Sequence, residues 1–191
     1  MDLSELLDDR RPRRTDARRN FDAILAAAAA AYAELGAGVA MDEIARRAGV
    51  GIATLYRNFP TRTALMEAVY LAAVHELVSY GETIQESDPW EALRAWLEKF
   101  VDFMKTKHPL VTVLTETSVV YLPTSEAIYR IADPLVDRAR AAGEVRPDLS
   151  ADDVMRVIFA VTGGIYRDGP QRRRVLEIVL DGMRPGSARG A

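Results

Sequence analysis

Residues 48–65 read AGVGIATLYRNFPTRTAL, and four polar side chains fall within five positions of this apolar segment before it ends at a proline. The polar residues, each able to donate a hydrogen bond, are Thr54, Tyr56, Arg57 and Asn58. Leu55 lies among them, so a helix here has a polar side and a side suited to a core. A short helix of this kind is small enough to enter the major groove of DNA.

Two neighbouring segments are expected to hold this helix. Residues 41–48, MDEIARRA, predict a helix of two turns, and Gly49 fits the tight turn after it because glycine adopts left-handed backbone angles without a Cβ penalty. Two short helices joined by about four residues are typical of a helix-turn-helix motif. Pro60 ends the second helix, and Thr61 is the expected N-cap of a long helix whose positive N-terminus favours a phosphate.

No other group of residues points to chemistry. The chain of 191 residues has no cysteine, which excludes disulfides and cysteine-ligated metals and suits a reducing cytoplasm. The two histidines, His75 and His108, stand apart without a repeated metal-binding spacing. No phosphate-binding glycine loop and no Ser/His/Asp set can be nominated. We therefore expect no cofactor, no metal and no enzymatic activity.

Charge is distributed unevenly along the chain. The net charge is −3, yet residues 10–62 contain ten arginines and five acidic residues, whereas residues 63–191 contain fifteen basic and nineteen acidic residues. A basic part followed by an acidic remainder indicates two functions in one chain, although chance clustering on a solvated surface gives the same counts. The segment RRPRRTDARR, residues 10–19, is either an arm along DNA or a passive solubilising tail.

Helical signals recur along the whole chain and strand signals are scarce, so we predict an all-α fold. Asp88 and Ser150 are expected N-caps, Pro134 is an expected kink or break, and Gly163 and Gly164 are expected inside a helix. The pattern of residues 108–121 is ambiguous between helix and strand, and we expect a helix there because the neighbouring segments are helical. Besides the two short helices, the expected helices cover residues 18–35, 61–85, 88–107, 124–142, 150–167 and 170–183.

The stretch MDEIARRAGVGIATLYRNFPTRTALMEAV resembles the DNA-binding domain of the TetR family of bacterial transcriptional regulators, and the resemblance covers residues 17–77. It implies that Ile52–Phe59 is the recognition helix. Ala40 stands where the family usually has a capping Ser or Thr, and apolar Ile52 stands where a polar side chain is common. The residues that the resemblance assigns to DNA contact are Ile52, Ala53, Thr54, Tyr56, Arg57, Asn58 and Arg62. Core or solvated-surface roles are the alternatives for the last four.

The resemblance also implies a division of the chain. Residues 1–16 are expected to be a disordered basic arm, and residues 17–77 a TetR-type helix-turn-helix domain. Residues 78–184 are expected to form a helical ligand-binding and dimerisation domain, followed by a disordered tail over residues 185–191.

One recognition helix contacts too few base pairs for specificity in a genome, so we expect a homodimer that reads two half-sites of a palindromic operator in double-stranded DNA. The apolar stripes of the last two helices would form a four-helix bundle with their symmetry mates, or else close the core of one chain. The residues of these stripes are Val154, Val157, Ile158, Val161, Ile165, Val175, Leu176, Val179, Leu180 and Met183.

Family members enclose a small-molecule pocket in the middle helices. The residues expected near such a pocket are Trp96, Phe100, Phe103, Met104, His108, Thr112, Glu116, Thr117, Tyr121 and Phe159. The predicted function is a dimeric repressor that an unknown small-molecule effector releases from its operator by moving the helix over residues 61–85. The alternative is a helical DNA-binding protein controlled by a protein partner, without a pocket. We expect a cytoplasmic protein with no membrane partner.

Overall fold

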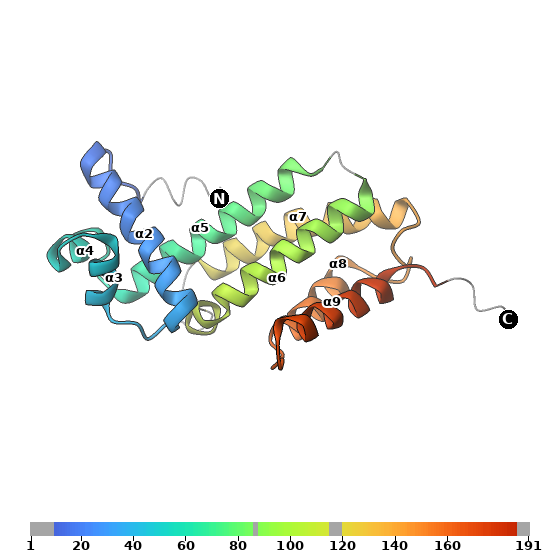
Figure 1. The fold of residues 1–191 in the computed structure, drawn as a ribbon. Coiled ribbons are helices and arrows are strands. Elements are labelled where there is room, and N and C mark those ends of the chain that lie inside the picture. The colour runs from blue at the N-terminus through green and yellow to red at the C-terminus, as the bar shows by residue number, and fades with distance from the viewer. Residues whose placement is uncertain (1–9, 86–87, 115–119, 187–191) are drawn as a thin grey trace. The chain divides into compact units, whose positions relative to one another are not determined.

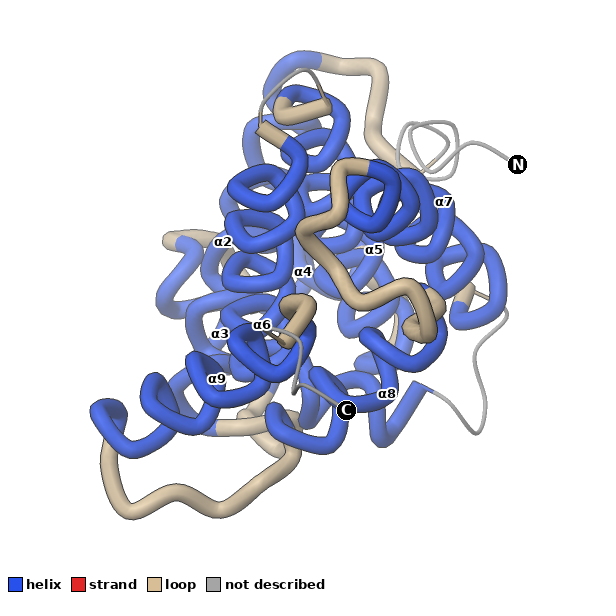
Figure 2. The backbone as a smooth tube through the Cα atoms, turned by 90° about the vertical axis from the view of Figure 1, so that its right-hand side faces the viewer, coloured by secondary structure: helices blue, strands red, loops and turns tan. Residues whose placement is uncertain are grey.

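The computed structural model describes residues 10–85, 88–114 and 120–186. All regular secondary structure in these residues is helical, which confirms the predicted all-α fold (Figures 1 and 2). None of these helices is both long and apolar enough to cross a membrane. Their bounds are α2 Thr15–Leu35, α3 Met41–Ala48, α4 Ile52–Asn58, α5 Arg62–Thr83, α6 Pro89–Leu114, α7 Tyr121–Ala141, α8 Ala151–Thr162 and α9 Gly169–Met183.

The described residues form two compact units. Unit 1 contains the described residues up to Glu76 together with those between Thr106 and Ser125, and unit 2 contains the others. Helices α5, α6 and α7 therefore contribute residues to both units. The domain boundaries expected from the sequence remain a prediction.

In unit 1, helices α2, α3 and α4 pack against one another. Phe21 of α2, Ile44 of α3 and Leu55 of α4 are almost completely buried. The rings of Phe21 and Phe59 contact each other at a tilt of 32°, with their centroids 4.8 Å apart. Burying each such side chain contributes about 1.5–3 kcal/mol, whereas an isolated helix as short as α4 is unstable in water. The orientation of α4 is therefore set by Leu55 and Phe59.

In unit 2, three helices approach closely at Gly81. A Cβ atom added to this residue of α5 would lie 2.2 Å from Cγ2 of Ile131 in α7 and 2.9 Å from Nε1 of Trp96 in α6. Both neighbours are buried, so they have little room to move. Helices α8 and α9 form a hairpin, and the Arg146 amide before α8 donates a hydrogen bond to the Met183 carbonyl at the end of α9.

The N-caps expected from the sequence are present. The Thr61 hydroxyl accepts a hydrogen bond from the Ala64 amide at 3.0 Å. The Asp88 carboxylate accepts bonds from two amides of the first turn of α6, each at 3.1 Å. Ser150 and Asp153 form a reciprocal capping box at the start of α8. Three of the helix starts could be found from sequence because each depends on residues only two or three positions apart.

Two of the middle helices are longer than expected. Helix α6 runs on to Leu114 because Leu110 and Leu114, both fully buried, continue its apolar side beyond Phe103. Helix α7 runs through Pro134 without a break, so of the expected kink or break the break is excluded and the kink stays a prediction. Ile131, Leu135 and Val136 on either side of the proline are buried, and their packing holds the helix across it.

Two helix ends also differ from expectation. Helix α8 ends at Thr162, so Gly163 and Gly164 lie in the following loop, and the expectation that they are helical was wrong. The Tyr166 hydroxyl donates a hydrogen bond to the Val161 carbonyl, which also accepts a bond from the Gly164 amide. At the other end of the chain, α2 begins at Thr15, inside the segment expected to be a disordered arm.

Ala40 occupies the N-cap position of α3 and makes no side-chain hydrogen bond, because alanine has no polar side-chain atom. Ala40→Ser is expected to stabilise the protein by about 1 kcal/mol, because a serine hydroxyl can accept a bond from a first-turn amide. For a chain of this size that corresponds to a rise of roughly 2–4 °C in the midpoint of thermal unfolding. Ala33→Ser, at an exposed position inside α2, is the matched control and should not raise the midpoint.

Candidate nucleic-acid interface

The turn between α3 and α4 has the geometry expected of it. Gly49 has φ 67° and ψ 27°, in the left-handed region, and its amide bonds to carbonyls of the last turn of α3. The Val50 amide donates to the Ala45 carbonyl at 3.1 Å, which closes the helix end. The chain then reverses within three residues and starts α4 at Ile52.

Helix α4 has one buried and one exposed side. Leu55 is fully buried and Phe59 is 3% exposed, so this side faces α2 and α3. The opposite side carries four of the residues predicted to contact DNA, and all four are exposed, namely Ile52, Ala53, Tyr56 and Arg57. Thr54 lies between the two sides and is half-buried. The exposed side has an apolar N-terminal end and a polar C-terminal end.

Two other predicted contact residues are engaged inside the protein. The side-chain amide of Asn58 donates to the Thr54 carbonyl at 2.8 Å and closes the last turn of α4. Nη1 of Arg62 donates to the Ala37 carbonyl at 3.2 Å and also to the Val39 carbonyl. Arg62 therefore ties the start of α5 to the loop after α2, a role that depends on a contact 25 residues away and that the sequence did not indicate.

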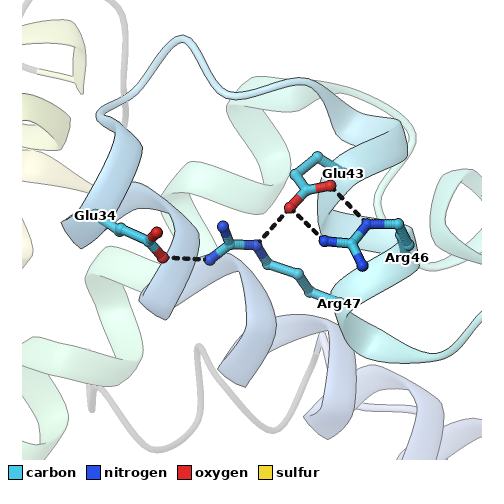
Figure 3. A network of polar contacts seen from close by, with 4 residues as sticks. All are labelled: Glu34, Glu43, Arg46 and Arg47. Carbon is cyan, nitrogen blue, oxygen red and sulfur yellow. Dashed lines mark hydrogen bonds and ion pairs between the residues drawn. The ribbon is translucent and has the colours of Figure 1, made fainter.

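An ion-pair network of four residues lies between α2 and α3 (Figure 3). Nη1 of Arg47 lies 2.6 Å from Oε2 of Glu34, and Nε of Arg47 lies 2.7 Å from Oε1 of Glu43. Nε of Arg46 lies 2.8 Å from the other oxygen of Glu43. The network joins α2 to α3, and its two arginines have their charges paired with carboxylates.

Pairing of this kind separates the arginines of the N-terminal part into two groups. Those paired with carboxylates are Arg10, Arg11, Arg19, Arg46 and Arg47. Those that are exposed and make no ion pair with any described residue are Arg13, Arg14, Arg18 and Arg57. Arg57 is thus the available cation on α4. Arg13 and Arg14 lie in the expected basic arm directly before α2, and Arg18 lies in the first turn of α2.

The network also predicts a pH dependence of stability. Hydrogen bonds from Arg46 and then Arg47 lower the pKa of Glu43 from 4.5 to about 2. A depressed pKa in the folded state stabilises the protein above the ordinary pKa, and this stabilisation is lost as pH falls through the folded value. Glu43→Gln should therefore lower stability in urea at pH 7. Its difference from the parent protein should shrink between pH 4.5 and about 2.

The matched control for this variant is Asp42→Asn, which removes one carboxylate from an exposed neighbouring position of the same helix. A Glu43→Gln effect that keeps its size down to pH 3 would contradict the role given to the ion pairs. So would an equal effect of Asp42→Asn.

The residues predicted for the dimer interface divide by exposure. The side chains packed inside the single chain are Val154, Ile158, Leu176, Leu180 and Met183, and the half-buried ones are Val161, Val175 and Val179. Val157 is 45% exposed on α8. Ile165 is fully exposed but lies in the loop after α8, so its expected place on a helical stripe was wrong. Ile178, which the prediction left out, is 69% exposed on α9.

The residues predicted for a ligand pocket include a packed aromatic cluster in unit 2. The ring of Phe100 lies with its centroid 5.6 Å from that of Trp96, 5.9 Å from that of Phe103 and 5.4 Å from that of Phe159. Met104 is also buried, whereas Phe159 is 39% exposed.

The other pocket candidates lie where the structure describes the backbone alone or outside the described residues. His108 and Thr112 lie in α6 and Tyr121 begins α7, but the structure describes only their backbone. Glu116 and Thr117 lie outside the described residues. The pocket stays a prediction.

Comparison with known proteins agrees with this geometry. Residues 24–69 match the model of the bacterial regulatory proteins of the tetR family, and residues 88–185 match the C-terminal domain of SbtR-like transcriptional regulators. The chain is 29% identical over 153 residues to the HTH-type transcriptional repressor LfrR of Mycolicibacterium smegmatis, covering 77% of this chain and 79% of that protein.

Solved structures extend the likeness over nearly the whole chain. The TetR transcriptional regulator SCO0520 of Streptomyces coelicolor is 36% identical, with 87% of this chain and 99% of that chain covered and a TM-score of 0.71. A TetR transcription regulatory protein of Mycobacterium vanbaalenii is 32% identical, with 91% and 100% covered and a TM-score of 0.71.

An N-terminal helix-turn-helix whose second helix is exposed on one side, followed by a helical C-terminal part, is the arrangement of a DNA-binding transcriptional regulator. The chain belongs to the TetR family of bacterial regulatory proteins. The prediction that the protein is a regulator and not an enzyme is confirmed by this membership.

Proposed function

We propose that this protein is a homodimeric repressor that binds a palindromic operator through α4 and leaves it when a small molecule binds the C-terminal part. The observation that carries the proposal is the exposed side of α4, where Tyr56 and Arg57 are held outward by the burial of Leu55. The similarity to a protein named as a transcriptional repressor supports the sign of the regulation. The proposal places the protein in the cytoplasm, where it meets the chromosome.

The proposed DNA contacts fall into phosphate contacts and base-edge contacts. Tyr56, Thr54 and the N-terminus of α5 contact phosphates, which set the position of α4 on the duplex without reading sequence. Arg57 reaches a phosphate or a guanine edge, and Ile52 and Ala53 present apolar surface to thymine methyl groups. Asn58 and Arg62 support the site from inside, by the hydrogen bonds to carbonyls described above.

The effector acts through helix α5, which is continuous from Arg62 to Thr83 and contributes to both units. Because the start of this helix is tied to the loop after α2 through Arg62, a shift of the helix carries the motif with it. Two recognition helices displaced in this way no longer match successive major grooves. Coupling of about 1–3 kcal/mol weakens operator binding roughly 5- to 150-fold.

The experiment has two steps. Operator fragments are selected from random DNA with the purified protein, and a library of small molecules is screened for compounds that raise its unfolding temperature. Each stabilising compound is then added to the protein–operator complex while fluorescence anisotropy is recorded. The proposal predicts compounds that stabilise the protein and weaken operator binding at least fivefold. Stabilising compounds that never change operator affinity would contradict release by a small molecule.

A further inference from the structure

The described chain before α2 is fastened to unit 1 at two points. Nη2 of Arg10 lies 3.2 Å from Oε2 of Glu67 in α5, whose side chain is only 15% exposed. Nε and Nη2 of Arg11 both donate to Oδ1 of Asp22 in α2, at 3.0 and 2.6 Å. Pro12 follows, and its ring restricts the backbone between these anchors and α2. The start of α2 is therefore tied to the folded part of unit 1.

Three arginines beside these anchors remain exposed, and we call them the arginine patch. Arg13 and Arg14 lie directly before α2, and Arg18 lies in its first turn. None of the three makes an ion pair with a residue in the described ranges, whereas the neighbouring Arg19 pairs with Asp16 at 2.6 Å. Like charges gathered on one surface repel one another, and an anionic partner relieves that repulsion.

The arginine patch lies next to the polar end of α4. Phe21 of α2 contacts Phe59, the residue after α4, with the ring centroids 4.8 Å apart. Arg18 precedes Phe21 by three residues, so it lies on the same side of α2 and about 4.5 Å nearer the start of the helix. Arg14 lies about 10 Å nearer that start than Phe21 does. Figure 1 shows the blue start of α2 extending past α4. The patch is therefore displaced by one to two helical turns from the end of α4 that carries Arg57.

We propose that the arginine patch binds phosphates of the DNA strand that borders the major groove occupied by α4. The inference rests on the proposed function and adds a second contact surface to it, one that does not read sequence. The major groove is about 12 Å wide, so a helix that lies in it has a phosphate strand within that distance on either side. The patch is displaced from α4 by a similar distance, and guanidinium groups bind phosphates through paired hydrogen bonds.

The anchors favour a DNA-binding arm over a passive solubilising tail. A tail that acts only by its charge needs no fixed position, and ion pairs with carboxylates reduce the charge that it offers. Here Arg10 and Arg11 are paired and fix the chain, while the three arginines of the patch stay exposed. A surface that is held in place before DNA arrives loses less conformational freedom on binding.

The salt dependence of affinity measures the number of phosphate contacts. Each contact contributes about 0.9 to the slope of log K against log salt concentration, and a dimer makes every contact twice. Arg13→Ala, Arg14→Ala and Arg18→Ala should therefore each reduce the steepness of this slope by about 1.8 when operator binding is followed by fluorescence anisotropy between about 50 and 200 mM salt. Because phosphate contacts carry no sequence information, each variant should weaken binding to unrelated DNA by the same factor as binding to the operator.

Two other arginines of the same segment are matched controls. Arg19 lies on the side of α2 opposite to Phe21, so Arg19→Ala should change the slope by less than half as much. Arg11→Ala loosens the chain before α2 but removes no phosphate contact, so it should weaken binding without reducing the slope. A slope reduced as strongly by Arg19→Ala or Arg11→Ala as by the patch variants would show a general effect of charge and overturn the assignment.

Arg57→Ala separates this inference from the proposed function, and circular dichroism checks that every variant is folded. Unchanged slopes for the three patch variants, in a protein whose operator binding Arg57→Ala weakens, would overturn the inference and leave the proposed function intact. Losses confined to the operator would also overturn it, because they would show contact with bases. If Arg57→Ala and the patch variants all leave operator binding unchanged, the proposed use of α4 fails as well.

Discussion

Arg57→Ala is expected to weaken operator binding by about 1–3 kcal/mol for each recognition helix, and by about twice that for a dimer that engages two half-sites. Arg57 is exposed at the polar end of α4 and makes no ion pair with the described residues, so its guanidinium is available to DNA. The substitution removes no buried contact, because Leu55 and Phe59 hold the helix in place. Fluorescence anisotropy at fixed salt measures the affinity, and circular dichroism checks the fold.

The control for this variant must remove the same charge elsewhere. Arg130→Ala does so on the exposed side of α7, outside the motif. It should change operator affinity less than threefold, because an exposed charge that makes no contact with DNA is screened at physiological ionic strength. Equal losses for the two variants would mean that net charge, and not contact by α4, sets the affinity.

Gly81→Ala is expected to destabilise the protein by about 1–3 kcal/mol, and by more if the helices must separate. The added Cβ would lie 2.2 Å from a methyl carbon of Ile131 and 2.9 Å from the indole nitrogen of Trp96. Ile131 is β-branched and buried, and Trp96 is fully buried, so neither side chain can move aside cheaply. Urea unfolding followed by tryptophan fluorescence measures the loss.

Two further variants separate overpacking from a general effect of the substitution. Gly169→Ala, at the first residue of α9 where a Cβ meets nothing within 4 Å, should be neutral or slightly stabilising. Ile131→Ala costs stability by itself because it leaves a cavity, yet combined with Gly81→Ala it should cost less than the sum of the two. Strict additivity would show that the two side chains do not compete for the same space.

The recognition motif could be predicted from sequence because its determinants are local. Gly49, Pro60 and Thr61 each act on backbone within a few residues, and the structure has all three where the pattern indicated. Leu55 among polar neighbours predicted the buried side of α4, and the structure adds Phe59, one turn later, to that side. The exposed side follows from the buried one by geometry.

The partners of the charged side chains could not be predicted in the same way. Arg62 donates hydrogen bonds to carbonyls 23 and 25 residues away, and Arg47 of α3 forms an ion pair with Glu34 of α2. A count of arginines carries no information about which of them are paired, since pairing depends on how α2 and α3 dock. The sequence therefore identified a basic segment but not that Arg57 is the unpaired cation of α4.

The ends of α8 and α2 were misjudged for a related reason. Gly163 and Gly164 follow a run with helical periodicity, but α8 ends at Thr162, where the Gly164 amide and the Tyr166 hydroxyl both bond to the Val161 carbonyl. Before the start of α2, Arg11 pairs with Asp22 at 2.6 Å and Arg10 pairs with Glu67 of α5, so two residues of the expected arm are held by ion pairs. Composition alone indicated a disordered arm there.

The central claim is that two copies of the exposed side of α4 read neighbouring turns of one duplex. Hydroxyl-radical footprinting of the protein on operator DNA selected from random sequence tests it most directly. We predict two protected regions related by a dyad, with major-groove contacts centred about 34–36 Å apart or at a multiple of that distance, and loss of both in Arg57→Ala. A selected site protected over a single region without dyad symmetry, or a footprint that Arg57→Ala leaves unchanged, would contradict the claim.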